Sequence, residues 1–505
     1  EPERRREPIT MTIRSTFGRV LATAIALSVL VPGAGSAQGA PPGQIIMPTP
    51  APMPTAGGTP LPYPAYGTPA PDVSHLTARP GVPSVVALSQ AVKIAVALSP
   101  VFAAQNAQWA AIHARYTSEK QALFPAVSGA GSIGNQYNNQ SFNPNAGVSP
   151  TSSPGGSIFA SRGTTASESL SITIQQLIYD GGRTIAAIHS AKSADYAGRA
   201  TLLRNLQTLE LNVANTYYAV LQNNATVISD AQLVKEFEVS EAAVSAQIRN
   251  GAAARSDLAA AQFQTATARG SLVTAQGQAI ASQAVFATTL GLDADALAVP
   301  KQLGAPFQAP NPSYGVSVKR ALLLRPDYIA AAYTVEADKE SLRYAKLARF
   351  PVLVAGASDG VGRSFGPLSS GYSNGKTLGL NLSVPIYDQG LTNYNVAVAA
   401  ATLDAAYDSL KQNGLQVESD VRSALANLIS ARALLVQTQA ELTAAKVSLD
   451  ATQAQYRVGA TTIINVVTAE ANLSTAQTDQ IKALYGTQTA QQNYLYATGT
   501  SDLQL

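Results

Sequence analysis

The sequence predicts a membrane α+β protein built by internal duplication, in which each half contributes two strands and a long helical hairpin. Three observations lead to this fold class. The chain repeats itself at a fixed offset, apolar residues alternate over segments of membrane-crossing length, and heptads of apolar residues follow in both halves. One chain therefore holds four strands and two helical hairpins.

The composition excludes several classes of protein. The chain has 505 residues, enough for two or more ordinary domains, and 34 basic against 31 acidic residues leave a net charge of +3. This balance gives no basic patch for nucleic acid. Without Cys there is no disulfide or thiolate metal site, and His75, His113 and His189 are too far apart in sequence to support another metal site. No nucleophile–base–acid spacing or phosphate loop is recognisable, so we expect neither an enzyme nor a cofactor.

Residues 1–37 are typical of an export signal. A start at Met11 would be followed by a positive region, a short apolar core and a small-residue cleavage site near Ala37, so residues 1–10 would be a mis-assigned start. This core is too short to anchor the chain, and no later apolar run reaches about 18 residues, so we expect no transmembrane helix in the mature chain. The lack of Cys at the cleavage site argues against an N-terminal lipid anchor. Residues 38–84 are a proline-rich linker, with a docking motif for another protein as the alternative.

The duplication is visible in the segments "LIYDGGRT" (177–184) and "PIYDQGLT" (385–392), which are offset by 208 residues. The same offset aligns residues 247–262 with residues 455–470. The chain is therefore a tandem duplication of one structural unit.

The first half is longer than the second. Upstream of the repeated segments, Ser99-Pro100 aligns with Arg325-Pro326 at an offset of 226 residues, which leaves 18 additional residues in the first half. We place them in residues 143–157, where Asn, Pro, Ser and Gly predict a loop.

Apolar and polar residues alternate before each repeated Ile-Tyr-Asp. The apolar positions are Leu170, Ile172, Ile174 and Ile178 in the first half, and Leu378, Leu380, Leu382, Val384 and Ile386 in the second. Such a run matches the about 9–11 residues of a tilted strand that crosses a bilayer. A second, glycine-rich strand follows Phe-Pro in each half, at 126–137 and 352–362. A soluble β-hairpin packed on a helix is the alternative, because alternation does not distinguish lipid from a protein core.

Long helices follow the strands in both halves. Heptad positions are occupied by Leu206, Val213, Val220, Val227 and Val234, and by Val421, Leu428, Leu435, Leu442, Leu449 and Tyr456. Each first helix would extend about 100 Å. We expect it to end at a glycine turn, Gly251 or Gly459, from which a second helix returns.

The repeated segment marks the junction at which a strand leads into a helix. We assign a helix N-cap to the carboxylate, a relaxed bend to the glycine and a place at the membrane–water boundary to the Tyr ring. These residues are Tyr179, Asp180 and Gly182 in the first half and Tyr387, Asp388 and Gly390 in the second. Their role is structural rather than catalytic.

Four strands are too few to close a membrane barrel, since the smallest known barrels have about eight. We therefore expect the chain to oligomerise so that no strand edge is left open. Two chains would supply eight strands around a filled lumen, and three would supply 12 around a pore.

The sequence resembles the TolC-type outer-membrane efflux proteins over residues 85–500. The segments "SLDATQAQYRVGATTIINVVTAEANLSTAQ" (448–477) and "LSVPIYDQG" (382–390) are close to motifs of the family's second repeat, and the first repeat is weaker but collinear. The match at 448–477 and the missing lipidation Cys favour the TolC-like branch.

The resemblance implies a homotrimer with one 12-stranded outer-membrane β-barrel, continuous with a long periplasmic α-helical coiled-coil barrel. It implies a periplasmic adaptor and an inner-membrane pump, ATP-driven or proton-driven, in a tripartite efflux or type I secretion system that exports small molecules or polypeptides. The repeats would be 85–295 and 318–500, separated by an equatorial segment at 296–317 and followed by a tail at 501–505.

The resemblance also implies a gate at the hairpin tips, where a Tyr and an Arg of the second repeat bind an Asp and a hydroxyl of the first. Here Tyr456 matches the Tyr, Asp257 the Asp and Ser256 the hydroxyl, but Thr461 stands in place of the Arg. Two acidic lumen positions of the family are Asn465 and Thr468. The alternatives are that Asp257 faces solvent and that Tyr456 is an ordinary heptad residue.

Two other functions account for part of the pattern. A passive outer-membrane porin would explain the strands but not the long paired helices. A trimeric coiled-coil surface adhesin would explain the helices but not the duplicated strand pairs. In an outer-membrane channel the loop at 143–157 would be extracellular, because long loops of such barrels lie outside the cell.

Overall fold

The computed structural model describes most of the chain from residue 85 onward. The described residues are 85–139, 162–251, 253–294, 299–301, 312–366 and 371–500. The expected signal segment at 1–37, linker at 38–84, loop at 143–157 and tail at 501–505 lie outside the described residues, as does part of the segment at 296–317.

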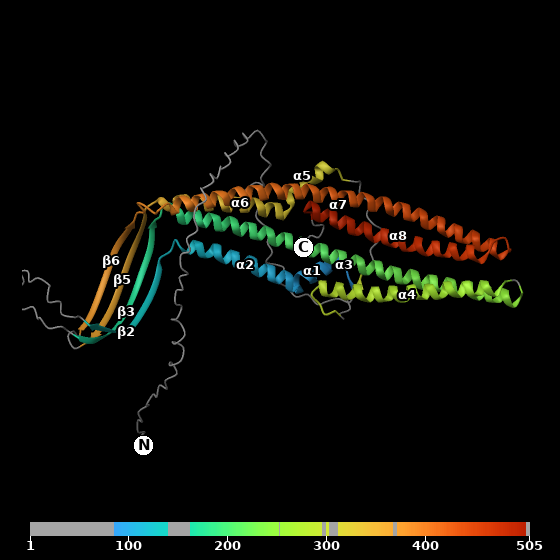
Figure 1. The fold of residues 1–505 in the computed structure, drawn as a ribbon, viewed down its shortest axis with the longest axis horizontal. Helices are drawn as coiled ribbons and strands as arrows, with labels where there is room; N and C mark the ends of the chain where they lie inside the picture. The colour runs from blue at the N-terminus through green and yellow to red at the C-terminus, as the bar shows by residue number, and fades with distance from the viewer. Residues whose placement is uncertain are drawn as a thin grey trace, which may run out of the picture. The chain divides into compact units, whose positions relative to one another are not determined.

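The same order of elements occurs twice along the described chain (Figure 1). The first half contains α1 (Leu88–Leu98), α2 (Pro100–Gln121), β2 (Ala126–Asn139), β3 (Arg162–Tyr179), α3 (Arg183–Arg249) and α4 (Arg255–Thr289). The second contains α5 (Tyr314–Leu324), α6 (Pro326–Lys346), the short 3-10 helix η2 (Leu347–Arg349), β5 (Val352–Phe365), β6 (Gly371–Ser383), α7 (Leu391–Arg457) and α8 (Ile463–Thr498). Two short strands, β1 (Val85–Val86) and β4 (Val299–Pro300), pair in parallel.

The four long strands form one antiparallel sheet in the order β2-β3-β5-β6. The central pairing of β3 with β5 joins the two halves, so neither half completes the sheet alone. Among the described strands, β2 and β6 each pair with one neighbour only. Both edges of the sheet therefore present unpaired backbone N–H and C=O groups.

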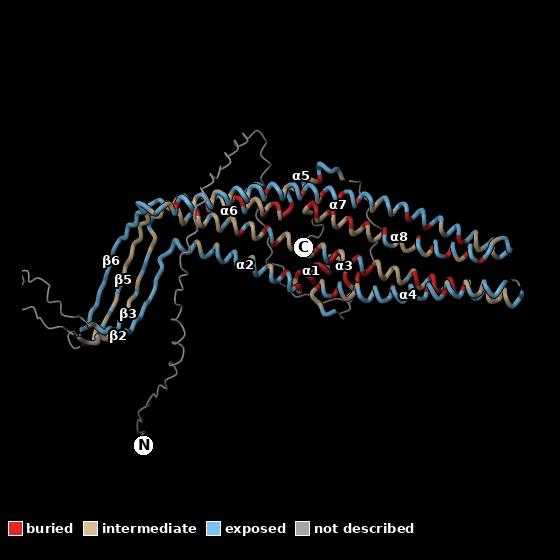
Figure 2. Tube along the Cα trace, viewed as in Figure 1, coloured by how far each residue is buried: buried red, intermediate tan, exposed pale blue. Residues whose placement is uncertain are grey.

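Large apolar side chains of the sheet are exposed in the single chain (Figure 2). They are Val127, Ile133, Leu170, Ile172, Ile174, Leu378, Leu380 and Leu382. The alternative of a soluble hairpin packed on a helix is therefore not what the structure shows. The exposed surface instead resembles the lipid-facing side of a membrane sheet.

The second apolar strand ends earlier than its sequence pattern predicts. We expected alternation through Ile386, but β6 ends at Ser383, which lies opposite Val352. The ladder stops there because the preceding residue of the partner strand, Pro351, has no N–H to donate.

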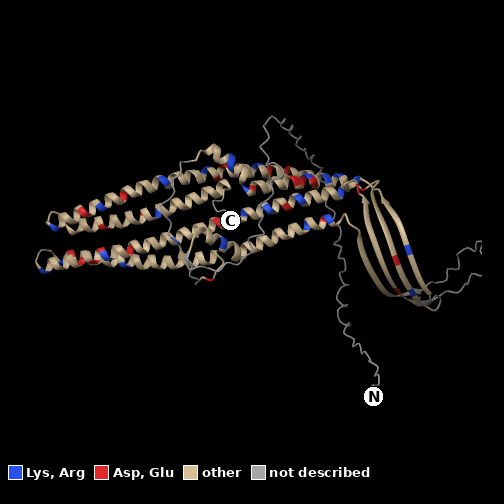
Figure 3. Ribbon diagram, turned by 180° about the vertical axis from the view of Figure 1, so that it is seen from behind, with Lys and Arg blue, Asp and Glu red and all other residues tan. Residues whose placement is uncertain are grey.

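Charged residues are sparse in the sheet and face one another across its strands (Figure 3). Lys376 lies opposite Asp359 with 3.3 Å between Nζ and Oδ2. Glu168 lies opposite Arg363 on the neighbouring strand. Each carboxylate is thus placed beside a cation, which lowers the cost of charge in an apolar surface.

The helices α3 and α7 have 67 residues each, so each extends about 100 Å. The heptad pattern predicted their packing, since most of its positions are buried against the returning helices α4 and α8. The buried heptad residues are Leu206, Val213, Val220, Val234, Val421, Leu428, Leu442 and Leu449. Both hairpins turn at a glycine with positive φ, Gly251 at 71° and Gly459 at 74°.

Buried apolar side chains form several distinct cores at different points along the helices (Figure 2). One core surrounds Tyr217 and Phe286 at the base of the first hairpin, and a second surrounds Leu428 at the base of the other. A third core near the tips contains Val244 of α3 and Val466 of α8, so it joins the two hairpins. Among the described helices none alone has the length and apolarity to cross a membrane; α1 and α2 pass that test together, with a 57° bend between them.

Candidate functional site

Near the tips of the two hairpins, a polar contact joins the halves of the chain beside the apolar core around Val244 and Val466. Tyr456, at the end of α7, directs its hydroxyl at Oδ2 of Asp257, in the first turn of α4, over 3.5 Å. Ser256 Oγ donates to the other carboxylate oxygen of Asp257 over 3.3 Å. The first distance is long for an O–H···O bond, so this contact is a weak latch.

Tyr456 is placed by its turn and by the apolar core behind it. Gly459 N–H donates to the Tyr456 carbonyl, which closes the turn three residues after the Tyr. The ring is half-buried against the core that contains Leu449 and Ile463. Burial and the Asp257 carboxylate raise the pKa of Tyr456 above its ordinary value, so the hydroxyl keeps its proton and can donate. Tyr456 is thus both a heptad residue and a hydrogen-bond donor.

The structure does not bring the other expected tip residues into this contact. Thr461, which precedes α8, accepts a hydrogen bond at Oγ1 from Nδ2 of Asn465 in the first turn of that helix, over 2.8 Å. No hydrogen bond among the described residues joins Thr461 to Ser256. Asn465 and Thr468 are exposed, three residues apart on one face of α8, and Thr468 Oγ1 donates to its own helix backbone.

The strand–helix junctions are alike in the two halves. Asp180 accepts backbone N–H bonds from Gly182 (3.0 Å) and Thr184 (2.6 Å), and Asp388 accepts the equivalent bonds from Gly390 (3.1 Å) and Thr392 (2.8 Å). Burial opposes ionisation of Asp180, but these bonds prevail and hold its pKa below the ordinary value. The bonds from Thr392 and Gly390 lower the pKa of Asp388 in the same way. Both junctions therefore keep an ionised carboxylate at the start of a long helix.

The Asp residues do not occupy the N-cap position that the sequence suggested. The N-caps are Gly182 and Gly390, with φ of 86° and 84°, and each Asp lies two residues earlier. The helices start later because two consecutive residues with positive φ turn the chain first. Tyr179 and Tyr387 are exposed beside these turns, and their place at a membrane–water boundary stays a prediction.

Gly181 packs against Phe350 of the second half, a contact that the sequence interpretation missed. Its φ is 70°, and a Cβ added there would lie 2.4 Å from Cβ of Phe350, which precedes β5. In the second half the matching residue is Gln389, which adopts a φ of 55° with a side chain present. The sequence did contain a signal of this contact. The first repeated segment has Gly-Gly where the second has Gln-Gly, because only the first junction must leave room for the ring of Phe350.

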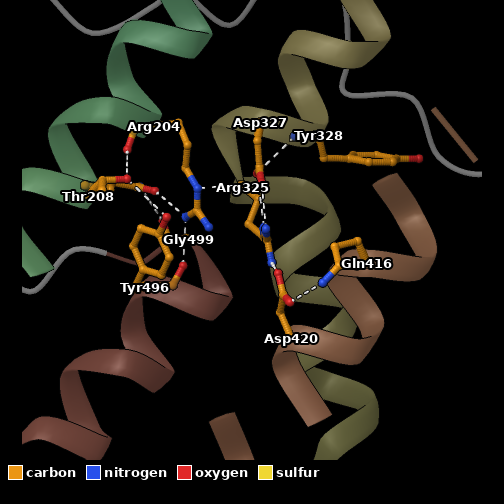
Figure 4. A network of polar contacts seen from close by, with 10 residues as sticks. Arg204, Thr208, Arg325, Asp327, Tyr328, Gln416, Asp420, Tyr496 and Gly499 are labelled. Atoms are coloured by element: carbon orange, nitrogen blue, oxygen red, sulfur yellow. Dashed lines mark hydrogen bonds and ion pairs between the residues drawn. The ribbon is translucent and has the colours of Figure 1, made fainter. Parts of the chain in front are cut away.

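A second missed feature is a buried network of charges at the base of the second hairpin (Figure 4). The Arg325 side chain is 4% exposed and donates to Asp327 over 2.6 and 3.0 Å and to Asp420 of α7 over 2.8 Å. Arg204 of α3 stacks on the ring of Tyr496 at 3.6 Å and donates to its carbonyl. Burial opposes ionisation of Asp327, but Arg325 and Arg204 hold its pKa below the ordinary value. The network fixes α3, α6, α7 and α8 to one another.

Residues 91–292 and 317–500, which make up most of both halves, match the family model described as "Outer membrane efflux protein". The chain belongs to this family. It is therefore an outer-membrane efflux channel protein and not an enzyme, and the residues assembled above belong to a transport channel.

Curated relatives and solved structures agree with this assignment. The efflux protein is 24% identical over 335 residues to BepC of Brucella suis biovar 1, covering 65% of this chain and 71% of that protein. It is 27% identical over 356 residues to TolC of Escherichia coli K12, covering 66% and 70%. Its fold matches that of VceC from Vibrio cholerae with a TM-score of 0.66 at 17% identity, over 82% of this chain and 96% of that one.

Two neighbouring glycines of this efflux protein give a matched test of the junction. Gly181→Ala should destabilise the protein more than Gly182→Ala, because both positions have positive φ but only the first would press a Cβ into Phe350. Gly182→Ala should cost about 1–2 kcal/mol from the backbone alone. Thermal unfolding of the two detergent-purified variants checks the order. Equal midpoints would show that the Phe350 contact does not hold the junction.

Proposed function

We propose that three copies of this chain form one gated duct that exports small molecules or polypeptides across the outer membrane. In this proposal the duct serves a tripartite efflux or type I secretion system, with a periplasmic adaptor and an inner-membrane pump. The observation that carries it is the open-edged, four-stranded sheet with exposed apolar side chains, followed by two hairpins with 67-residue helices.

The open edges support assembly into a barrel. Inside a bilayer each unpaired backbone group costs several kcal/mol, so lipid-exposed sheet edges do not persist there. Pairing β2 of one copy with β6 of the next would satisfy both edges with the same kind of antiparallel ladder. Three copies would close a 12-stranded barrel, wide enough for a duct.

The outer faces of the helices support the same assembly. Several large apolar side chains on them are at least 64% exposed in the single chain: Val239, Phe263, Val273, Ile280, Val436 and Val447. Neighbouring copies would cover these side chains, because apolar helix faces of this extent seldom remain in water. The helices would then continue the barrel as a coiled-coil wall on the periplasmic side.

The tip supports gating. Tyr456 and Asp257 join the two hairpins of one copy, so the contact must break if the hairpins separate to widen the mouth. We assign this end to the adaptor and the pump, since the other end of each hairpin leads into the sheet. With Thr461 in place of an Arg, the latch has fewer polar contacts, and the apolar core around Val244 and Val466 supplies the rest of the resistance to separation.

The trimer predicts a specific cross-link between copies. The natural chain has no Cys, so Ser132→Cys on β2 can be combined with single Cys substitutions along β6 (371–383). Within one copy β3 and β5 separate these strands, so a disulfide can form only between copies. At the matching register, oxidised membranes should give bands at the mass of two and three chains.

Cys positions on β3 in place of β6 provide the control, because β3 should pair with β2 of the same copy and give no larger band. Failure of every β6 position to cross-link, together with a detergent-extracted protein of one-chain mass, would contradict the trimer.

An experiment that detects association with a pump distinguishes an efflux duct from a passive porin. After chemical cross-linking in cells, the tagged protein should copurify an adaptor and an inner-membrane transporter. A tip with both Val458 and Ile464 replaced by Asp should lose these partners while its trimer remains, because these side chains are 79% and 67% exposed. Copurification of neither partner from cells that nevertheless take up small solutes through the protein would favour the porin.

The latch predicts a change in conductance. Tyr456→Phe removes only the hydroxyl, and Asp257→Ala removes its acceptor, so each should raise single-channel conductance in planar bilayers. At 3.5 Å we expect about 0.5–1 kcal/mol per copy, the lower part of the range for a hydrogen bond, and three copies together bias a two-state mouth. The double variant should add little to either single variant, since both remove one interaction. Unchanged conductance in both single variants would show that this contact is not the latch.

A further inference from the structure

A cavity of about 660 Å³ lies between α3, α7 and α8, on the base side of the Tyr456–Asp257 contact. Its charged lining residues are Lys235 and Glu236 from α3, Lys446 and Asp450 from α7, and Glu470 from α8. None of the lining residues described comes from α4. The cavity therefore lies where the two hairpins of one copy meet, and it would open if they separated.

Glu470 is the buried acid of this cavity. It is 4% exposed, and the Ser240 hydroxyl of α3 lies near enough to oppose part of the rise in its pKa, so Glu470 lies where the second hairpin meets the first. None of the ion pairs found among the described residues includes it, although Lys235 and Lys446 line the same cavity. Burial, with a contribution from the neighbouring Glu236, raises the pKa of Glu470 to about 7.

The duplication shows that the hairpin does not need an acid at this position. The residue of the first half that aligns with Glu470 is Gln262, which is exposed on α4. The same helical unit therefore folds with a neutral side chain of the same shape. The carboxyl group is a specific feature of the surface at which α8 meets α3.

We propose that Glu470 is a proton-binding site that couples pH to the separation of the hairpins. The neutral acid is compatible with the packed arrangement of α3 and α8, whereas the carboxylate favours an arrangement in which water enters the cavity. This inference rests on the proposed gated duct. It assigns to that gate a regulating ion, the proton, in addition to its mechanical latch.

The direction of the pH effect follows from proton linkage. In the separated arrangement Glu470 would be hydrated, and its pKa would fall toward the ordinary 4.5, so the packed arrangement binds the proton more tightly. The packed state is thus fully favoured below the lower pKa, and this preference is lost as the pH rises through about 7. Between pH 7.5 and 5.5 the ratio of packed to separated hairpins should rise roughly twentyfold per copy.

The test compares the full-length channel with Glu470→Gln, which imitates the protonated acid and copies the residue of the first half. Two spin labels, at Cys introduced in place of the exposed Ala266 on α4 and Ala471 on α8, report the separation of the hairpins. Conductance in planar bilayers at pH 5.5 and 7.5 reports the duct. The exposed Glu441 of α7, changed to Gln, is the matched control.

We expect the channel with Glu470 intact to show closer labels and lower conductance at pH 5.5 than at pH 7.5. Glu470→Gln should give the pH 5.5 result at both values, and Glu441→Gln should behave like the parent. Glu236→Gln, which removes the neighbouring negative charge, should shift the midpoint to lower pH.

Label separations in Glu470→Gln that keep the parent's pH dependence would overturn the proposal while leaving the duct intact. If no variant conducts at any pH, the proposed duct fails, but the label separations still decide whether Glu470 couples protons to the hairpins.

Discussion

The pairing of backbone groups at the edges of the sheet is the constraint on which the rest of this structure depends. A single chain satisfies the inner ladders, β2 with β3, β3 with β5 and β5 with β6, and leaves β2 and β6 open. In a bilayer those edges would have no water to bind, which is the physical reason for the assembly proposed above. The duplication fits this need, because two similar hairpins joined edge to edge can continue in the same manner from copy to copy.

The transition from sheet to helix imposes the next constraint. A strand and a helix of 67 residues meet with only three residues between them in the first half, so the turn must be sharp. Positive φ at two successive residues makes the turn, and an ionised Asp holds the first helical N–H groups in both halves. Only the first junction also packs against the other half, through Gly181 and Phe350. The junction therefore aligns the two helical hairpins as well as starting them.

The sequence predicted the elements that depend on periodicity and missed those that depend on unique contacts. Heptads at Val421 and Leu428 and the glycine turns located the hairpins, since a helix repeats its environment every turn or two. The alternation of apolar and polar residues located the strands but placed the end of β6 too late. The end of this strand is set by Pro351, which precedes the partner strand β5. No pattern in the sequence pairs Arg325 with Asp420, which are far apart in the chain and meet only after α6 packs on α7. The contact between Tyr456 and Asp257 was predicted from the family resemblance and not from residue spacing.

The two halves differ most where the second hairpin meets the rest of the chain. At aligned positions, Arg325 and Asp420 stand where the first half has Ser99 and Asn212, and Glu470 stands where it has Gln262. Arg325 and Glu470 place an ionisable group at a buried position, and Asp420 places a charge beside one of them; such burial costs free energy unless a partner offsets it. At the base the partners are present, so Arg325 holds the hairpin firmly. Near the tip, none of the ion pairs among the described residues includes Glu470, so its burial favours the neutral acid over the carboxylate. The second hairpin is thus tied by ion pairs at its base and carries, among the described residues, an unpaired buried acid near its tip, which is the division that the proposed gate requires.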